Sequence, residues 1–288
     1  MVKFNEYKYE RPDLSKVQKD LEEQIALIGS GKDLKTEIKA IYKVFEINDK
    51  NDTSATLVSV RNSLNTNDEF YEKEQAFFDE NGPNLQQYNH QFLEKVLSSE
   101  HRKGLEKEFG ALMFLRGELA QKTFKPEIIS DMQKENKLST EYGKLIASAK
   151  IEFQGGTYNL SQMSPFLQDK NRETRHQAQL AVSKFFETNE ADFDRIYDEM
   201  VKVRTVIAKK LGYENFVQLG YDRFGRTDYT SVDVKTYRDQ IFEDIVPLVS
   251  NLIERKAKRL GIENPKSYDL ALSFLSGNPT PKGDRQWQ

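Results

Sequence analysis

The sequence predicts a mainly helical fold with one short β-hairpin. Three observations lead to this prediction: apolar residues recur with a period near 3.6 along almost the whole chain, Gly (15 of 288 residues) and Pro (8) are scarce, and only one stretch alternates apolar with polar residues. The chain is long enough to form one large domain or two ordinary ones, each with its own core.

The N-terminal region carries a series of amphipathic stripes. Gly29 and Gly31 end the first stripe, the polar stretch at 48–54 predicts a loop, and the sequence "NGPN" at 81–84 predicts the end of another helix. The stripe over 105–119 is strong and predicts one helix. Helices are therefore predicted over residues 14–28, 34–45, 57–64, 70–78, 85–96 and 105–119.

The next region holds the one clear interruption of the helical pattern. Pro126 suits the first turn of a further helix, whose apolar stripe runs through 138–149. The sequence "AKIEFQGGTYNLSQ" follows, and its residues 151–160 alternate on both sides of Gly155 and Gly156. Because glycine accepts positive φ, we predict a β-hairpin that turns at this pair.

Helices return for the remainder of the chain. Asp169 is predicted to be an N-cap, a stripe over 193–207 ends at Gly212, and a short helix begins near Val217. The last stripe, over 234–252, contains Pro247, which predicts a kink or a helix junction. We place a change in organisation near residue 125 and divide the sequence into an N-terminal helical region, 1–125, and a second region, 126–288.

Composition excludes several classes of function. The formal net charge is −3, which gives no overall electrostatic footprint for nucleic acid. The chain has no cysteine, so disulfides, thiolate metal sites and a cysteine nucleophile are excluded. No apolar run approaches the ~18 residues of a membrane span, and the first residues lack the apolar core of a signal peptide. We therefore expect a cytoplasmic protein that binds neither nucleic acid nor membranes.

Residues suited to catalysis are few. His90 and Glu94 are four residues apart and could share a metal ion on one helix face, or simply form a surface hydrogen bond. His101 lies in a polar stretch that suits a helix start, and His176 lies among charged residues, as either a general base or an ordinary surface residue. The sequence contains no H-E-x-x-H, P-loop or G-x-S-x-G motif. No catalytic and no metal-ligating residue is therefore predicted in this chain.

One aromatic and basic stretch, "GYENFVQLGYDRFGRTDY" (212–229), is the candidate binding region. Its arginines could make bidentate contacts with carboxylates. The alternative is that its apolar residues fill the core while its arginines pair with Asp222 and Asp228. The candidates for a substrate cleft are Tyr221, Arg223, Arg226 and Tyr229.

The same stretch resembles the oligoendopeptidase F branch of the thimet-type metallopeptidases. The similar segments follow in order: "YKYERPD", "DEFYEKEQAFFDENGP", "KLSTEYGKLIASAKIEFQGGTYNLSQM", "DKNRETRHQAQLAVSKFF" with Asp169, Arg172 and Arg175, "VRTVIAKKLGYENFVQLGYDRFGRTDY", and "IVPLVSNLIERKAKRLGIENPKSYDLALSFLSGNPTPKG". Together they extend from about residue 4 to residue 283, and the ordered series is more specific than any one of its motifs.

The resemblance implies a helical clamshell with a deep cleft that cleaves short peptides. In this family the two histidines of H-E-x-x-H and a later glutamate hold zinc, and the glutamate of the motif is the general base. Those groups lie beyond the region that resembles this chain. The resemblance therefore implies the N-terminal half of a zinc endopeptidase, with zinc and short peptides expected for the full-length protein and no activity for this chain alone. We expect an interruption after Gly283, because "DRQWQ" does not continue the family pattern.

An alternative is a helical binding or adaptor protein that is independent of any peptidase, and a short paralogue that regulates the full enzyme is a third possibility. A separated half predicts exposed apolar surface on the helices at 193–211 and 234–260, whereas an adaptor predicts a polar surface there. The sequence does not predict an oligomeric state.

Overall fold

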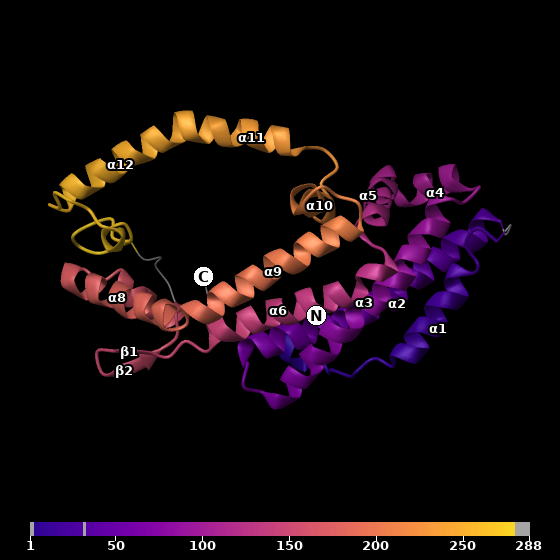
Figure 1. Cartoon of the computed structure of the whole chain (residues 1–288), viewed down its shortest axis with the longest axis horizontal. Coiled ribbons are helices and arrows are strands. Elements are labelled where there is room, and N and C mark those ends of the chain that lie inside the picture. The colour runs from indigo at the N-terminus through magenta and orange to yellow at the C-terminus, as the bar shows by residue number, and fades with distance from the viewer. Residues whose placement is uncertain (1–2, 31–32, 280–288) are drawn as a thin grey trace. The chain divides into compact units, whose positions relative to one another are not determined.

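The computed structural model describes residues 3–30 and 33–279. It confirms a mainly helical fold with one antiparallel hairpin (Figure 1). The tail at 280–288, on which the predicted interruption depends, and Gly31 lie outside the described residues. No helix in the described part of the chain has the length and apolar character needed to cross a membrane.

The chain divides into two compact units, each made of two separate segments. Unit 1 comprises Met1–Gly143 and Ile196–Ser231, and unit 2 comprises Lys144–Arg195 and Val232–Gln288. These units are defined by contacts, whereas the predicted ranges 1–125 and 126–288 follow the sequence pattern. The boundary at residue 125 stays a prediction.

Unit 1 is a helical assembly with two apolar clusters. One cluster centres on Leu21, Ile41 and Phe114, and the other on Ile128, Ile207 and Leu219. The elements wholly in this unit are η1 (Phe4–Glu6), α1 (Leu14–Ile25), α2 (Leu34–Leu64), α3 (Glu69–Leu97), α4 (Arg102–Phe109), α5 (Ala111–Thr123), η2 (Pro126–Ile128) and α10 (Phe216–Arg223). Helix α6 (Ile129–Ala147) begins in unit 1, and α9 (Glu190–Lys210) ends in it.

Two predicted breaks in unit 1 are wrong. Helix α2 continues through 48–54, where Thr53 and Ser54 direct their hydroxyls to carbonyls four residues back and so keep helical geometry. Helix α3 continues through "NGPN" with Pro83 inside it. The predicted helix over 105–119 is in turn two helices, because Gly110 adopts φ 85° between them.

Unit 2 contains the hairpin and the last helices. Strands β1 (Ile151–Phe153) and β2 (Gly156–Tyr158) pair with Phe153 opposite Gly156, as predicted, although the positive φ values fall on Gln154 and Gly155. Asn171, not Asp169, caps α8, because its side chain accepts bonds from the backbone of Glu173 and Thr174. The other elements are η3 (Ser161–Met163), α7 (Ser164–Leu167), α8 (Arg172–Thr188), α11 (Ser231–Gln240), η4 (Ile241–Ile245), α12 (Val246–Arg259) and η5 (Ser267–Asp269).

The predicted junction near Pro247 is present. Element η4 is a π-helix, and α12 begins with Pro247 in its first turn. Proline tolerates this place because the first N–H groups of a helix have no intrahelical partner. The helical run from Ser231 to Arg259 is therefore continuous, but its hydrogen-bond pattern passes from α to π over Ile241–Ile245 and then returns to α.

Candidate functional site

The aromatic and basic stretch at 212–229 comprises the turn after α9, helix α10 and the segment that follows. Asn215 begins α10 by accepting a bond from the backbone N–H of Val217 at 2.9 Å. The helix ends at Arg223, and Gly225 beyond it has a φ of 63° that turns the chain back so that the N–H of Arg226 reaches the carbonyl of Tyr221. This turn brings Arg226 beside the helix that precedes it.

Arg226 lies among three aromatic rings. Its guanidinium carbon is 5.0 Å from the ring centre of Tyr221, 5.0 Å from that of Phe224 and 5.1 Å from that of Tyr229. Rings at this distance attract a cation, by about 0.5–1 kcal/mol each at exposed sites. Within residues 3–30 and 33–279, no protein acceptor takes up the N–H groups of this side chain. Arg226 is thus a fixed cation with hydrogen-bond donors to spare.

Arg223 has a different environment. It donates to Glu135 Oε2 at 2.9 Å, and Arg204 donates to Glu135 Oε1 at 2.7 Å. Both guanidinium groups also lie over the ring of Phe216. The structure therefore brings Tyr221, Arg226 and Tyr229 together and holds Arg223 in an ion pair between α10 and α6.

The alternative interpretation of this stretch fits only in part. Leu219 is fully buried in the core, but Phe224 is 76% exposed. Asp222 pairs with no arginine; it accepts a bond of 2.6 Å from Tyr213 and one of 2.8 Å from Gln218. Burial and the bond to Asp222 raise the pKa of Tyr213. Of the two acidic residues expected to neutralise the arginines, Asp222 is therefore occupied by other groups.

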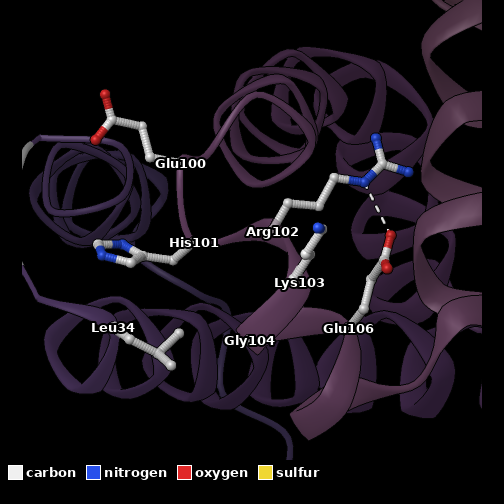
Figure 2. A pocket seen from close by; sticks show the side chains of 7 residues that line it. All are labelled: Leu34, Glu100, His101, Arg102, Lys103, Gly104 and Glu106. Carbon is white, nitrogen blue, oxygen red and sulfur yellow. Dashed lines mark hydrogen bonds and ion pairs between the residues drawn. The ribbon is translucent and has the colours of Figure 1, made fainter.

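A second candidate is a hollow of about 590 Å³ at the start of α4. Figure 2 shows Arg102, Lys103 and Glu106 on one side of it and His101 with Leu34 on the other. Arg102 is bonded to Glu106 at 2.9 Å and to Glu118 at 2.6 Å, so its charge is neutralised. This hollow presents a paired Arg102, while the buried Nδ1 of His101 has no hydrogen-bond partner in the described part of the chain.

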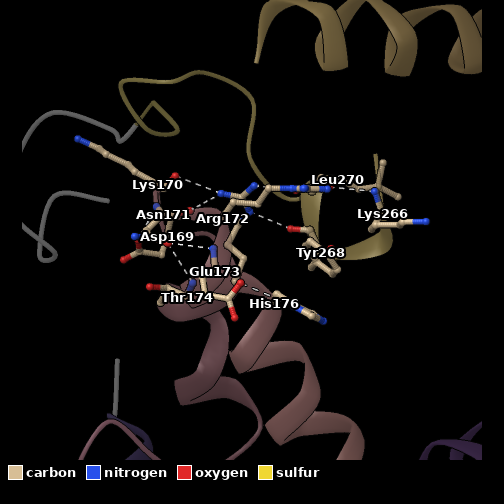
Figure 3. Close-up of polar contacts among 12 residues, drawn as sticks. Asp169, Lys170, Asn171, Arg172, Glu173, Thr174, His176, Lys266, Tyr268 and Leu270 are labelled. Atoms are coloured by element: carbon tan, nitrogen blue, oxygen red, sulfur yellow. Dashed lines mark hydrogen bonds and ion pairs between the residues drawn. The ribbon is translucent and has the colours of Figure 1, made fainter. Parts of the chain in front are cut away.

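The largest polar network is in unit 2 and joins α8 to η5 (Figure 3). Arg175 and Asp269 are 1% and 2% exposed, and their ion pair measures 2.8 Å. Arg172 donates to the same carboxylate at 2.8 Å and lies over the ring of Tyr268. The sequence pattern identified the two arginines but missed Asp269, which is 94 residues from Arg175.

Opposing effects set the pKa of Asp269. Burial raises it, but hydrogen bonds from Arg172, from the backbone N–H of Lys266 and from Arg175 outweigh burial and hold the pKa well below its ordinary value. Asp269 is therefore ionised in the folded protein at neutral pH. The carbonyls of Asp169 and Tyr268 accept further bonds from Arg175, so the network satisfies a buried guanidinium and has a structural role.

The three histidines are dispersed. His90 packs its ring against Phe124, His101 lies 3.4 Å from the buried Glu37, and His176 stacks on Tyr268. Among the described residues, no three His, Cys, Asp or Glu side chains are grouped so as to hold a metal ion. The donor set of these residues therefore does not fit a zinc site of the H-E-x-x-H type.

Comparison with known proteins gives one relationship from both sequence and structure. A family model described as the Peptidase M3 N-terminal domain matches residues 4–124. A comparison with curated proteins gave no match. Among solved structures, one described as an oligoendopeptidase F is 42% identical to this chain, with a TM-score of 0.97. The match covers 100% of this chain and 51% of the oligoendopeptidase F chain.

Two further solved structures are similar to the same extent. PZ peptidase A with an inhibitor is 41% identical with a TM-score of 0.97, covering 99% of this chain and 51% of its own. An oligoendopeptidase F from Bacillus anthracis str. Ames is 41% identical with a TM-score of 0.95, covering 98% and 52%. The chain thus spans about half the length of the proteins that it matches.

Proposed function

The chain belongs to the oligoendopeptidase F-like branch of the M3 peptidases and corresponds to the N-terminal half of its members, and from this premise we propose that it is part of a zinc endopeptidase that hydrolyses peptide bonds in short oligopeptides. The observation that carries the proposal is 41–42% identity along nearly the whole chain to two proteins described as oligoendopeptidase F and to PZ peptidase A. Identity at this level extends over both compact units.

In this proposal the zinc ligands and the general base belong to the part of the relatives' chains that this chain does not match. When bound there, zinc would polarise the scissile carbonyl and activate a water molecule. The residues of this chain supply the scaffold and contacts to the substrate. The 288 residues alone are expected to hydrolyse nothing.

We assign the substrate contact to Tyr221, Arg226 and Tyr229. The rings of Tyr221, Phe224 and Tyr229 hold the guanidinium of Arg226 in place. This lowers the conformational entropy that the side chain loses when it binds a ligand. Its free donors match a carboxylate, which a short peptide carries at its C-terminus and on acidic side chains. Arg223 orients α10 through Glu135 and does not reach the substrate directly.

The test compares two proteins: the 288-residue chain, and the same chain joined to the part of PZ peptidase A that it does not match. We expect the joined protein to bind one zinc ion and to cleave a fluorogenic short peptide, with loss of cleavage on chelation. The chain alone should do neither. Tight stoichiometric zinc binding or chelator-sensitive cleavage by the chain alone would contradict the proposal. A joined protein that folds but is inactive would contradict it as well.

A further inference from the structure

The helical run of α11, η4 and α12 has an exposed apolar surface. From Ser231 to Lys256, none of its residues is buried. Phe242 is 72% exposed and Leu248 is 54% exposed. The exposed apolar residues of this surface, named here the α11–α12 face, include Tyr237, Phe242, Ile245, Leu248, Val249 and Leu252.

The spacing of these residues shows that the exposure is organised. Phe242, Ile245, Val249 and Leu252 recur at intervals of three and four residues, the spacing of one side of a helix. A helix of this kind ordinarily buries its apolar side against a neighbour, and burying one large aliphatic or aromatic side chain contributes about 1.5–3 kcal/mol. Contiguous apolar surface of this extent on a protein marks an interaction site.

Only the end of the run is attached within unit 2. Ala257 and Leu260 are buried, Lys256 donates to the carbonyl of Leu270 at 2.6 Å, and Arg259 donates to that of Ser273 at 3.0 Å. The preceding turns have no comparable packing in the described chain. The fold therefore holds this helix at its C-terminal end and leaves the rest available.

The charges along the run bear on the class of partner. Lys235 and Arg238 precede Asp239, Glu243 and Asp244, and Lys235 pairs with Asp239 at 2.5 Å, so both signs are present along the run. An apolar stripe with a rim of mixed charge is typical of an interface between folded protein segments. It does not suit the phosphate backbone of a nucleic acid, which requires clustered positive charge.

We propose that the α11–α12 face is the docking surface for the half of an oligoendopeptidase F-type chain that this chain does not match. Three solved relatives contain the equivalent of this chain within polypeptides about twice as long, so each has a further segment of comparable size. The inference rests on the proposed function for the identity of that segment. It adds that the α11–α12 face is a surface through which that segment binds.

The experiment co-expresses the full 288-residue chain with the unmatched half of PZ peptidase A as a separate, tagged polypeptide. The complex is purified through the tag, and its stoichiometry and dissociation constant are measured by light scattering and analytical ultracentrifugation. We expect a 1:1 complex. The double variant Phe242→Glu, Leu248→Glu should weaken it at least tenfold, because it places two charges in an apolar interface.

The matched control is Leu64→Glu with Leu112→Glu, which changes two exposed leucines of unit 1 in the same way and should leave the affinity unchanged. Circular dichroism establishes that both double variants stay helical. As a second measurement, hydroxyl-radical footprinting should show Phe242 protected in the wild-type complex and Leu64 equally reactive with and without the partner.

Three outcomes overturn the inference: no complex, a complex that both double variants bind equally well, or a stable homodimer of the chain that the Phe242 and Leu248 variant dissociates. The peptide assay of the joined protein distinguishes this failure from failure of the proposed function. If the joined protein cleaves peptides but the Phe242 and Leu248 variant does not weaken the complex of the two separate halves, only the inference is rejected. A complex that needs this face but cleaves nothing rejects only the peptidase function.

Discussion

Arg226 and Arg175 carry the same group in opposite settings. Arg175 is buried, bonds to Asp269 and to backbone carbonyls, and has little capacity left for a ligand. Arg226 is only partly buried, is fixed by ring contacts, and keeps its donors free within the described chain. The first arrangement stabilises a fold, while the second is suited to binding an anion.

Replacing Arg226 tests this assignment. Arg226→Gln should weaken binding of a short peptide with a free C-terminal carboxylate about tenfold, because a charge-assisted bond contributes roughly 1.5–3 kcal/mol. Isothermal titration of the joined protein, made inactive by removing zinc, measures the change. Lys39→Gln, an equal loss of charge at an exposed position on α2, should have no effect. Equal weakening by both variants would show a general charge effect.

The Asp269 network makes unit 2 sensitive to acid. Because the folded pKa of Asp269 is lowered, this carboxylate stabilises the fold fully above its unfolded pKa of about 4, and the contribution is lost as pH falls toward the folded value. Urea titrations between pH 7 and pH 3 should show stability falling below pH 4. Asp269→Asn should be less stable at pH 7 and should show a shallower fall. An unchanged slope in that variant would contradict the assignment.

At the scale of elements, α3 shows why a local breaker need not end a helix. Pro83 has no N–H, so the carbonyl of Asp79 loses its partner within the helix. Asn136 of α6 donates to that carbonyl at 3.2 Å, and Gln133 donates to the carbonyl of Glu80 at 2.6 Å. Asn136 thus supplies the bond that Pro83 removes, Gln133 adds a further bond to the next carbonyl, and both donors lie more than 50 residues away.

A double-mutant cycle measures this compensation. Asn136→Ala should destabilise the protein by about 1–2 kcal/mol, because it leaves a buried carbonyl without a donor. In a Pro83→Ala background, residue 83 provides an N–H to Asp79, and the cost of Asn136→Ala should fall by about half or more. Chemical denaturation of the four proteins gives the coupling. Strict additivity would mean that Asn136 does not compensate for the proline.

The break between α4 and α5 depends on backbone conformation. Gly110 adopts φ 85° and ψ 145°, a region that other residues rarely enter, although a side chain there would meet no neighbouring atom. Gly110→Ala should therefore destabilise unit 1 by about 1–3 kcal/mol through strain alone. The control, Gly143→Ala in the open interior of α6, should be neutral or stabilising by up to about 1 kcal/mol. Thermal melts of both variants compare them directly.

For the whole molecule, the sequence predicts those features that local pattern determines. Periodicity is local, so it gives the helical class, and alternation beside Gly155 gives the hairpin. It cannot give Asp269 as the partner of Arg175, the bonds from Asn136 to α3, or the assembly of each unit from two segments, because these depend on residues distant in the sequence. Arg226 was found as a candidate by residue type, but its three-ring environment required the turn at Gly225.

The interpretation as a separated half also belongs to this scale. Its distinguishing expectation was exposed apolar surface on the helices at 193–211 and 234–260. Tyr197, Val201 and Val206 are exposed on α9, and the α11–α12 face is exposed over several turns. An independent adaptor protein would be expected to have polar side chains at these positions, so the surface favours the peptidase interpretation.

The separation of 94 residues between Arg175 and Asp269 has a consequence for protein synthesis. A ribosome adds about 5–20 residues per second, so roughly 5 to 20 seconds pass between the two residues. Throughout that interval α8 carries a cation that the finished fold buries, and Asp269, the carboxylate that pairs with it in the fold, has not yet been made. Unit 1, by contrast, has all of its segments once residue 231 has been made. Nascent chains should therefore acquire protease resistance in unit 1 first, because the buried ion pair of α8 forms only after Asp269 has been made.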